Sequence, residues 1–436
     1  MYGMKTKWMG AALLAALIGA TGCSKNEDGG DGGDGGGGSN ASKLESYAMT
    51  PEWINYATAV SSELLDDCIG LWAAWNGPTG IPDEDWERIG RDFFSKNTVV
   101  GANGYAEYMR TADAGNAKFT SGVDAIRTIL VDGFANISNE VGSSKIGNPN
   151  TLAKDGKTTE AVLQVESWYS WNSITDYSDN IISIKNGYAG RIGAIGDAAH
   201  ANSISAYVKS QNADLDAQMT AAIDGAYNAI KSMQSPFRNN LTGTKVDAAI
   251  EACADLTELT EGELLGAFRD AGDYDFTSIL TQYADQVVTP TYKDMKEKAW
   301  TLYKAMQALQ ADNKSQAKVD AACTAWRAMR VPWEQSEAVL FGPAGEETGL
   351  GRPDDGQLAA GSGGYRYDHN QQEPVYRRTV HRGDRQRVGS RIPHDRTASV
   401  QRRAKQEGTR RVTPEENRTF SYARLCPLLY RSIRFM

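Results

Sequence analysis

The stretch PEWINYATAVSSELLDDCIGLWAAWN, residues 51–76, is the clearest indicator of the fold class of this chain. Its apolar residues recur every three or four positions, at Trp53, Ala57, Val60, Leu64, Cys68, Leu71 and Trp75. That period places them on one face of an α-helix, and Pro51 suits a first helical turn, where no amide donor is needed. The stretch therefore predicts one amphipathic helix of about seven turns.

The same helical period continues through most of the chain. Three further segments carry it: residues 123–141, 159–184 and 213–233. Pro236 follows the last of these segments, and stretches rich in Gly and Pro at 77–82 and 147–156 are expected to separate helices. Sustained strand alternation is absent from the sequence. The pattern predicts an all-α protein built from helical bundles.

A second helical set begins near Asp275. Two apolar stripes follow, from Tyr292 to Leu309 and from Val319 to Leu340, and together they predict a helical hairpin. Pro332 lies inside the second stripe, where it removes a backbone hydrogen bond and should kink the helix. We expect a first bundle over residues 44–265 and a second, incomplete bundle over 275–350.

One face of the second hairpin helix carries charged residues. Arg330, Glu334, Glu337 and Phe341 are spaced at i, i+4, i+7 and i+11. One interpretation is an ordinary Arg330–Glu334 helix pair, worth about 0.3 to 0.5 kcal/mol, next to tryptophans of the core. The other is a polar pocket between the two bundles, where ligand sites commonly form.

Composition narrows the class of protein. The 436 residues, 41% of them hydrophobic, suit a soluble globular protein with two modest cores. The formal net charge of -9 argues against a nucleic-acid partner. The five Cys form neither a Cys-x-x-Cys pair nor a zinc-binding spacing, so we expect isolated thiols.

The N-terminus has the pattern of a lipoprotein signal peptide. Lys5 and Lys7 precede an apolar run over residues 9–18, and Ala20-Thr21-Gly22-Cys23 is similar to a lipobox. We expect residues 1–22 to be the signal peptide. A plain secretory signal without lipid is the alternative.

A lipid on Cys23 would provide the membrane contact. Residues 24–28 are similar to the acidic signal that sends some Gram-negative lipoproteins to the cell surface. We therefore expect the protein to be lipid-anchored to the outer membrane or the cell surface of a Gram-negative bacterium. Residues 23–43, rich in Gly and Asp, are expected to form a flexible linker.

The C-terminal segment differs abruptly from the rest of the sequence. From Arg352 onward there are 17 Arg and one Lys, whereas Lys outnumbers Arg about two to one before it. The apolar helical period ends at Gly351. One interpretation is a genuine basic tail that binds nucleic acid or membrane phosphates. The other is a shifted reading frame.

Back-translation favours the shifted frame. With suitable codons read one base later, residues 391–396 yield Gly-Phe-His-Thr-Ile-Glu, and residues 356–362 yield Asp-Ser-Trp-Pro-Leu-Asp-Gln. The translated residues fix the first two bases of most codons, so most target strings are not obtainable in this way. We expect residues 351–436 to be an aberrant tail that is disordered or irregular.

Both recovered strings resemble signatures of the imelysin-like family, helical lipoproteins once grouped with metallopeptidases and now mostly linked to bacterial iron uptake. Residues 325–337, AWRAMRVPWEQSE, followed by Leu340-Phe341-Gly342-Pro343, are similar to the family's most recognisable segment. Residues 286–292 resemble the start of its N-terminal half, and residues 165–173, VESWYSWNS, its C-terminal half. The resemblance covers roughly residues 45–350 and implies two four-helix-type bundles in circularly permuted order.

The resemblance also implies a site between the bundles. Its implied residues are Arg330, Glu334, Ser336, Glu337, Ser170, Asn172 and Asp176. In the family, the His and Glu of Gly-x-His-x-x-Glu lie one helical turn apart, and such donors suit iron or zinc. Here Pro393 and Arg396 occupy those positions, and a guanidinium cannot ligate a metal. We therefore expect binding of iron or zinc to be weak or lost.

Three functions remain open at this level. The favoured one is an imelysin-like surface or periplasm-facing lipoprotein that binds an iron species or a component of an iron-uptake system. The second is a metallopeptidase of the imelysin type, although an activated zinc water needs three protein ligands and a base, and the sequence has no His-Glu-x-x-His. The third is a damaged product without activity.

Overall fold

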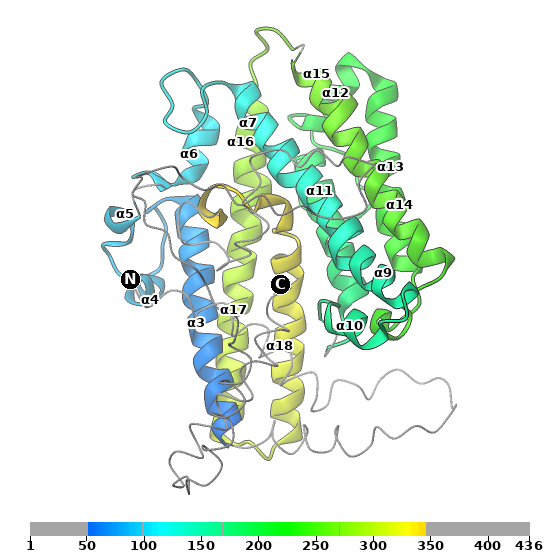
Figure 1. The fold of residues 1–436 in the computed structure, drawn as a ribbon. Coiled ribbons are helices and arrows are strands. Elements are labelled where there is room, and N and C mark those ends of the chain that lie inside the picture. The colour runs from blue at the N-terminus through cyan, green and yellow to red at the C-terminus, as the bar shows by residue number, and fades with distance from the viewer. Residues whose placement is uncertain (1–50, 98–99, 168–169, 270, 346–436) are drawn as a thin grey trace, which may run out of the picture. The chain divides into compact units, whose positions relative to one another are not determined.

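A computed structural model describes residues 51–97, 100–167, 170–269 and 271–345 of the chain. Every regular element in these residues is helical, which confirms the predicted all-α class (Figure 1). The expectations for the signal peptide, for Cys23 and the linker, and for the Arg-rich segment 351–436 lie outside the described residues.

Three long helices form one group. Helix α3 (Pro51–Asn76) has the predicted bounds, and α17 (Thr289–Ala311) and α18 (Gln316–Glu334) form the predicted hairpin. Helix α17 packs against both α3 and α18 (Figure 1). Its apolar stripe is buried from Tyr292 to Leu309. The contacts thus place α3 with the hairpin, whereas the sequence predicted one bundle over residues 44–265.

A second group contains a continuous helical segment. It consists of α7 (Gly122–Thr128), η2 (Ile129–Ala135), α8 (Asn136–Asn139), η3 (Glu140–Gly147) and α9 (Asn148–Lys154), where η2 and η3 are π-helical. The sequence predicted a break between helices over residues 147–156. This prediction is wrong for residues 147–154, which continue the helical segment. Pro149 falls in the first turn of α9, just after a π-helical segment, and a first turn tolerates proline.

The predicted helix over 159–184 is instead two helices, α10 (Thr158–Leu163) and α11 (Ser173–Ala189). Between them, Ser167 and Trp171 have φ values of 57° and 58°. This left-handed backbone is incompatible with a right-handed helix, so the chain has to turn here. The turn directs the residues before α11 toward α18.

Helix α11 links the two groups of helices. It contacts α18 on one side and α12 (Ile204–Gln211) and α13 (Ala213–Ser232) on another, and α13 packs on α14 (Thr244–Leu259). The shorter elements are α4 (Asp83–Ile89), α5 (Phe93–Lys96), α6 (Tyr105–Arg110), η4 (Phe237–Asn239), η5 (Thr260–Leu264), α15 (Leu265–Arg269), α16 (Thr277–Tyr283) and η6 (Ala284–Val288). Helix α13 ends before Pro236, as predicted.

The end of α18 differs from the prediction. The apolar stripe predicted a helix to Leu340, but α18 ends at Glu334, two residues after the buried Pro332. Beyond it, backbone hydrogen bonds join residues three positions apart in the sequence. The chain there forms the 3-10 turns η7 (Glu337–Val339) and η8 (Gly342–Ala344). Glu337 therefore does not continue the helical face of Arg330.

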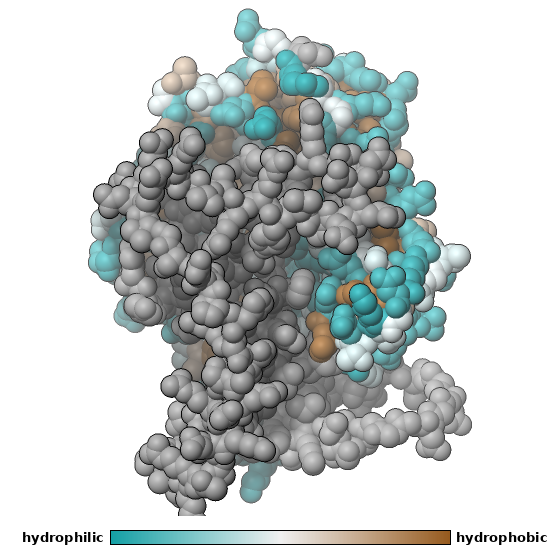
Figure 2. All heavy atoms as spheres, in the orientation of Figure 1, coloured by the Kyte–Doolittle hydropathy of each residue, from teal (hydrophilic) through white to brown (hydrophobic). Residues whose placement is uncertain are grey.

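The described surface is mainly hydrophilic in the view of Figure 2, with separate hydrophobic areas. Among the described residues, the exposed large apolar side chains lie in helices α3 and α10 and in three separate loops: Tyr56, Leu163, Trp171, Ile192 and Tyr274. Within the described ranges, every helix falls short of the length and apolar character that crossing a membrane requires. Cys68 and Cys253 are buried free thiols, as expected for isolated cysteines, and Cys323 is buried as well.

Candidate functional site

Arg330 is the centre of a buried ionic cluster. Its Nη2 lies 3.2 Å from Glu166 Oε1 and 3.0 Å from Asp176 Oδ2, and it also pairs with Glu334 one turn along α18. Arg330 is 6% exposed, and Asp176 and Glu334 are fully buried. The predicted Arg330–Glu334 helix pair is therefore present, but both side chains lie in the interior and belong to a larger cluster.

Lys145, from the π-helical segment η3, is the second buried cation. Its Nζ lies 3.1 Å from Glu166 Oε2, 3.6 Å from Glu140 Oε1 and 3.7 Å from Glu337 Oε2. Glu166 thus bridges Lys145 and Arg330 with its two oxygens. Segments that are far apart in the sequence meet at this one carboxylate.

Neutral side chains complete the cluster. Ser167 Oγ donates a hydrogen bond to Asp176 Oδ2 at 2.5 Å, and Asn172 Nδ2 donates to Asp176 Oδ1 at 2.6 Å. Asn180 Nδ2 donates to Glu334 Oε2 at 2.6 Å, while its Oδ1 accepts from the buried lysine at 3.0 Å. These bonds hold the carboxylates in fixed orientations.

Two predicted site residues donate hydrogen bonds within turns and do not contact the charged side chains of the cluster in the described structure. Ser170 Oγ donates to Ser167 O at 3.1 Å, inside the left-handed turn before α11. Ser336 Oγ donates to Trp333 O at 2.7 Å at the end of α18. The other five predicted residues take part in the cluster or adjoin its cations: Arg330, Glu334, Glu337, Asn172 and Asp176.

The cluster contains more buried acids than buried bases. Four carboxyl groups and two cations are at least nine-tenths buried: Glu166, Asp176, Glu334 and Glu337, with Lys145 and Arg330. Burial raises the pKa of Glu334 well above its ordinary value, and Arg330 opposes this only in part. Burial also raises the pKa of Asp176. The excess negative charge is relieved by a proton on Glu334 or by an additional cation.

The two cations remain charged. Burial alone lowers the pKa of a lysine, but the carboxylates of Glu166 and Glu337 outweigh it and raise the pKa of Lys145 well above its ordinary range. Arg330 is affected in the same direction, since Asp176 and Glu334 outweigh its burial and raise its pKa. Protons are therefore exchanged at the carboxyl groups of this site.

Asp179 lies beside the cluster, on α11. Gln335 Nε2 donates a hydrogen bond to Asp179 Oδ1 at 2.8 Å. Burial raises the pKa of Asp179 to about 6, against the lowering effect of that hydrogen bond. This carboxyl group consequently titrates close to neutral pH.

Sequence reasoning missed four members of the cluster: the charged Lys145 and Glu166 and the neutral Ser167 and Asn180. Glu166 belongs to the quoted VESWYSWNS segment, so its acidic side chain next to Ser167 was an available signal. Lys145 lies in a helical segment beside the buried Ile146, and a lone lysine there gives no sign of its acidic partners. Its contacts with η7, α11 and the α10–α11 turn arise only in three dimensions.

No group of three or more His, Cys, Asp or Glu side chains in the described ranges is arranged to hold a metal ion. In the cluster, Lys145 and Arg330 contact the carboxylates that would otherwise face a metal. Pro393 and Arg396, which the sequence predicts at the family's ligand positions, lie outside the described residues. The expectation for iron or zinc remains a prediction.

The fold and the cluster define a class of all-α proteins with a buried polar site where two helix groups meet. The sequence profile of imelysin matches residues 29–262 and 288–362. This chain belongs to the imelysin family. The match confirms the family resemblance, while the permuted order and the frameshift remain predictions.

Two solved structures are similar to this chain. An imelysin peptidase from Bacteroides ovatus shares 36% identity, covers 69% of this chain and 79% of its own, and has a TM-score of 0.61. A putative iron-regulated protein A precursor from Parabacteroides distasonis shares 22% identity over 61% of this chain and 97% of its own, with a TM-score of 0.34.

A curated relative matches over a shorter stretch. Iron-regulated protein A of Synechococcus elongatus is 42% identical over 65 residues. These residues are 15% of this chain and 18% of that protein, so the match spans less than a fifth of the relative.

Proposed function

We propose that this chain is an imelysin-family binding protein that acts in iron acquisition, and that the Arg330 cluster forms the acidic side of its ligand site. The observation that carries the proposal is the imbalance of four buried carboxyl groups against two buried cations. Buried charge of this kind is costly unless it is paired, so its presence favours a functional role. The similarity over 65 residues to one protein named iron-regulated protein A supports iron as the context.

A positively charged ligand group would enter by replacing a proton. Burial raises the pKa of Glu334 well above its ordinary value, so this group releases a proton when a cation approaches. Asn180 and Arg330 hold its carboxylate in place. Asn172, which is partly buried, orients Asp176 in the same way.

Binding is better supported than peptide hydrolysis. Zinc-dependent hydrolysis needs three protein ligands around a bound water and a base beside it. The carboxylates of the cluster are instead held by Lys145 and Arg330, and among the described residues His200 is the single histidine. The similar protein from Bacteroides ovatus is named a peptidase, and peptidase activity is the alternative that the test has to address.

Three further statements belong to this proposal. Lipid on Cys23 would anchor the protein to the outer membrane or cell surface of a Gram-negative bacterium, with iron-uptake components rather than nucleic acid as partners. The bundle order would be circularly permuted. The segment from Arg352 onward would be translated out of frame, which removes Gly-x-His-x-x-Glu and weakens binding of iron or zinc.

Calorimetry with ferrous, ferric and zinc ions tests the proposal on the full chain and on a frame-restored chain. We expect weak binding by the full chain and at least tenfold tighter binding after restoration. Glu334→Gln in the restored chain should weaken binding at least tenfold, whereas Glu251→Gln, at an exposed position of α14, should leave it unchanged. Tight binding that survives Glu334→Gln would place the site elsewhere, and peptide cleavage by the restored chain would favour the peptidase.

A further inference from the structure

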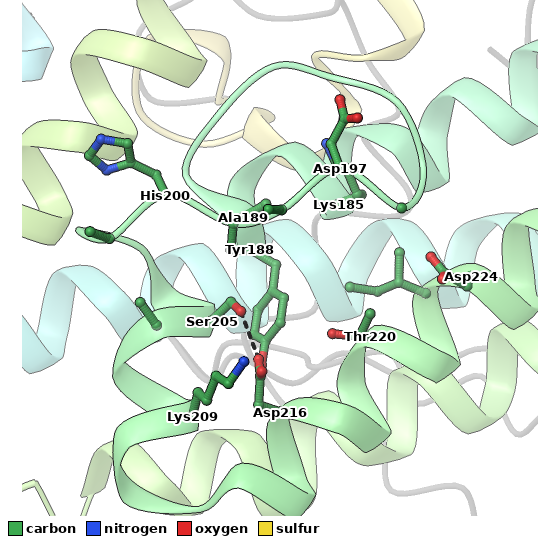
Figure 3. A pocket seen from close by; sticks show the side chains of 16 residues that line it. Lys185, Tyr188, Ala189, Asp197, His200, Ser205, Lys209, Asp216, Thr220 and Asp224 are labelled. Carbon is green, nitrogen blue, oxygen red and sulfur yellow. Dashed lines mark hydrogen bonds between the residues drawn. The ribbon is translucent and has the colours of Figure 1, made fainter.

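A separate cavity of about 390 Å³ lies among α11, α12, α13 and the loop over residues 190–203. Figure 3 shows two lysines at different places around it, Lys185 beside Asp197 at the loop and Lys209 on α12. None of the residues that line the cavity belongs to the Arg330 cluster. The cavity is therefore a site of its own, and its volume is in the range of pockets for small molecules.

The amine of Lys185 is buried without being held in place. The side chain is 6% exposed, and its Nζ has no hydrogen-bond partner in the described part of the chain. Gly193 of the loop lies against it, since a Cβ at this position would be 3.1 Å from Nζ. Because no hydrogen bond fixes the amine, rotation of its flexible four-carbon chain can bring Nζ into the cavity that the side chain lines.

The surroundings of Lys185 favour its neutral form. Burial is the main cause that lowers the pKa of this amine, and the guanidinium of Arg191 lowers it further. Asp197 and Asp224 raise the pKa and oppose burial only in part. A lysine acts as a nucleophile only when it is unprotonated, and burial near a second cation is one way in which proteins obtain that state.

Lys209 provides a comparison within the same cavity. It also lines the cavity, but its side chain is exposed. Water therefore solvates the ammonium of Lys209, whereas protein surrounds that of Lys185. Both lysines meet the same small molecules, so a difference in their reactivity reports on their surroundings.

The acidic lining of the cavity selects against anions. Three aspartates line it, Asp197, Asp216 and Asp224, together with the two lysines. With Lys185 and His200 neutral, the aspartates exceed the remaining lysine by two. An anionic aldehyde such as glyoxylate is then repelled, whereas a neutral aldehyde is not.

We propose that Lys185 is a nucleophilic amine that forms an imine with a small neutral aldehyde in this cavity. The lone pair of the nitrogen attacks the carbonyl carbon, and the resulting carbinolamine loses water to give the C=N bond. The carbonyl oxygen leaves in that water together with both hydrogens of the amine, so the step needs no oxidant or reductant. This site is separate from the Arg330 cluster and does not depend on the function proposed for it.

Reductive trapping on the full chain tests this proposal. Sodium cyanoborohydride converts the imine of propanal into a stable propyl-lysine, and peptide mass spectrometry then measures each lysine separately. At pH 7 we expect Lys185 to be labelled at least threefold faster than Lys209. As the pH approaches the ordinary pKa of lysine, this advantage should shrink, because other lysines become neutral as well. Glyoxylate should label Lys185 with a smaller advantage over Lys209, or none.

A pair of variants tests the role of the surroundings. Asp224→Asn removes a carboxylate that stabilises the ammonium, so labelling of Lys185 should become at least twofold faster. Asp255→Asn, at an exposed position of α14, should leave it unchanged. In denaturing urea Lys185 and Lys209 should be labelled equally fast.

The proposal is overturned if propanal labels Lys209 as fast as Lys185 in the folded chain at pH 7. It is also overturned if Lys185 keeps its advantage in urea, because the local sequence rather than the fold would then cause it. An equal advantage of Lys185 with glyoxylate and propanal would refute the preference for a neutral aldehyde.

Discussion

Lys145 and Lys185 are buried to almost the same extent, 7% and 6% exposed, yet their surroundings have opposite effects. Lys145 is surrounded by three carboxylates and an amide oxygen, and its pKa is raised. Lys185 has no hydrogen-bond partner in the described structure, and its pKa is lowered. Burial alone therefore does not determine the state of a lysine, because the partners decide whether its charge stabilises the fold.

The largest effect on the free energy of unfolding is expected from replacing each of these two lysines with methionine, in separate variants. Lys145→Met should lower the free energy of unfolding by about 3 to 5 kcal/mol, because it leaves buried carboxylates without their cation. Lys185→Met should raise the free energy of unfolding, since it removes an unpartnered charge. Urea unfolding at neutral pH measures both.

Lys154→Met is the matched control for Lys145→Met. Lys154 pairs with Asp247 at 2.7 Å, but both side chains are half exposed. Its loss should cost at most about 1 kcal/mol. A cost for Lys145→Met no larger than this control, or a loss of stability in Lys185→Met, would break the comparison between the two lysines.

Glu334→Gln is expected to have the next largest effect. Since the pKa of Glu334 is raised above its ordinary value of 4.5, the folded state binds more protons than the unfolded state. Stability is then highest below pH 4.5 and falls as the pH rises through the folded pKa. Glu334→Gln should reduce this slope and stabilise the protein at neutral pH by on the order of 1 kcal/mol. An unchanged pH profile would show that Glu334 is ionised in the folded protein.

Asp179→Asn gives a smaller effect in a narrower range of pH. Its pKa of about 6, against an ordinary value of 3.8, means that its contribution to stability falls as the pH rises from about 4 to 6. The variant should lack this phase while keeping an acceptor for Gln335. Unfolding midpoints from pH 3.5 to 7 test this, and a profile identical to that of the parent chain would exclude Asp179 as the titrating group.

Ser170→Ala should have the smallest effect. It removes one part-buried hydrogen bond, from Ser170 Oγ to Ser167 O, and should cost about 0.5 kcal/mol, the lower end of the range for a hydrogen bond. Because Ser170 braces the turn and does not contact the charges in the described structure, binding of a ligand to the cluster should remain unchanged. A loss of binding without a loss of stability would assign Ser170 a direct role in the site.

The helices with continuous apolar periodicity were predictable from the sequence, and α3 is the clearest case. The break between α10 and α11 was not, because Ser167 and Trp171 adopt a left-handed backbone without being glycine. Pro149 caused the opposite error, a predicted break where the helix continues. A proline in the first turn of a helix and a proline that ends a helix look alike in sequence.

The candidate site was predictable only in part. The spacing of Arg330 and Glu334 predicts that they meet on one helix face, but spacing alone does not distinguish a surface pair from a buried one. Lys145 and Glu166 join them through contacts between distant segments. Such contacts depend on how the helices pack, which hydrophobic periodicity does not specify.

The π-helical segments η2 and η3 have a consequence for how this chain tolerates changes in length. A π turn contains one residue more than an α turn, and each added residue rotates everything after it by about 100°. Deleting one residue from η2 would therefore convert a π turn into an α turn and leave Lys145 directed at Glu166. A single-codon deletion should thus be tolerated better in η2 than in an α-helical segment such as α11, where it would rotate all later residues of the helix.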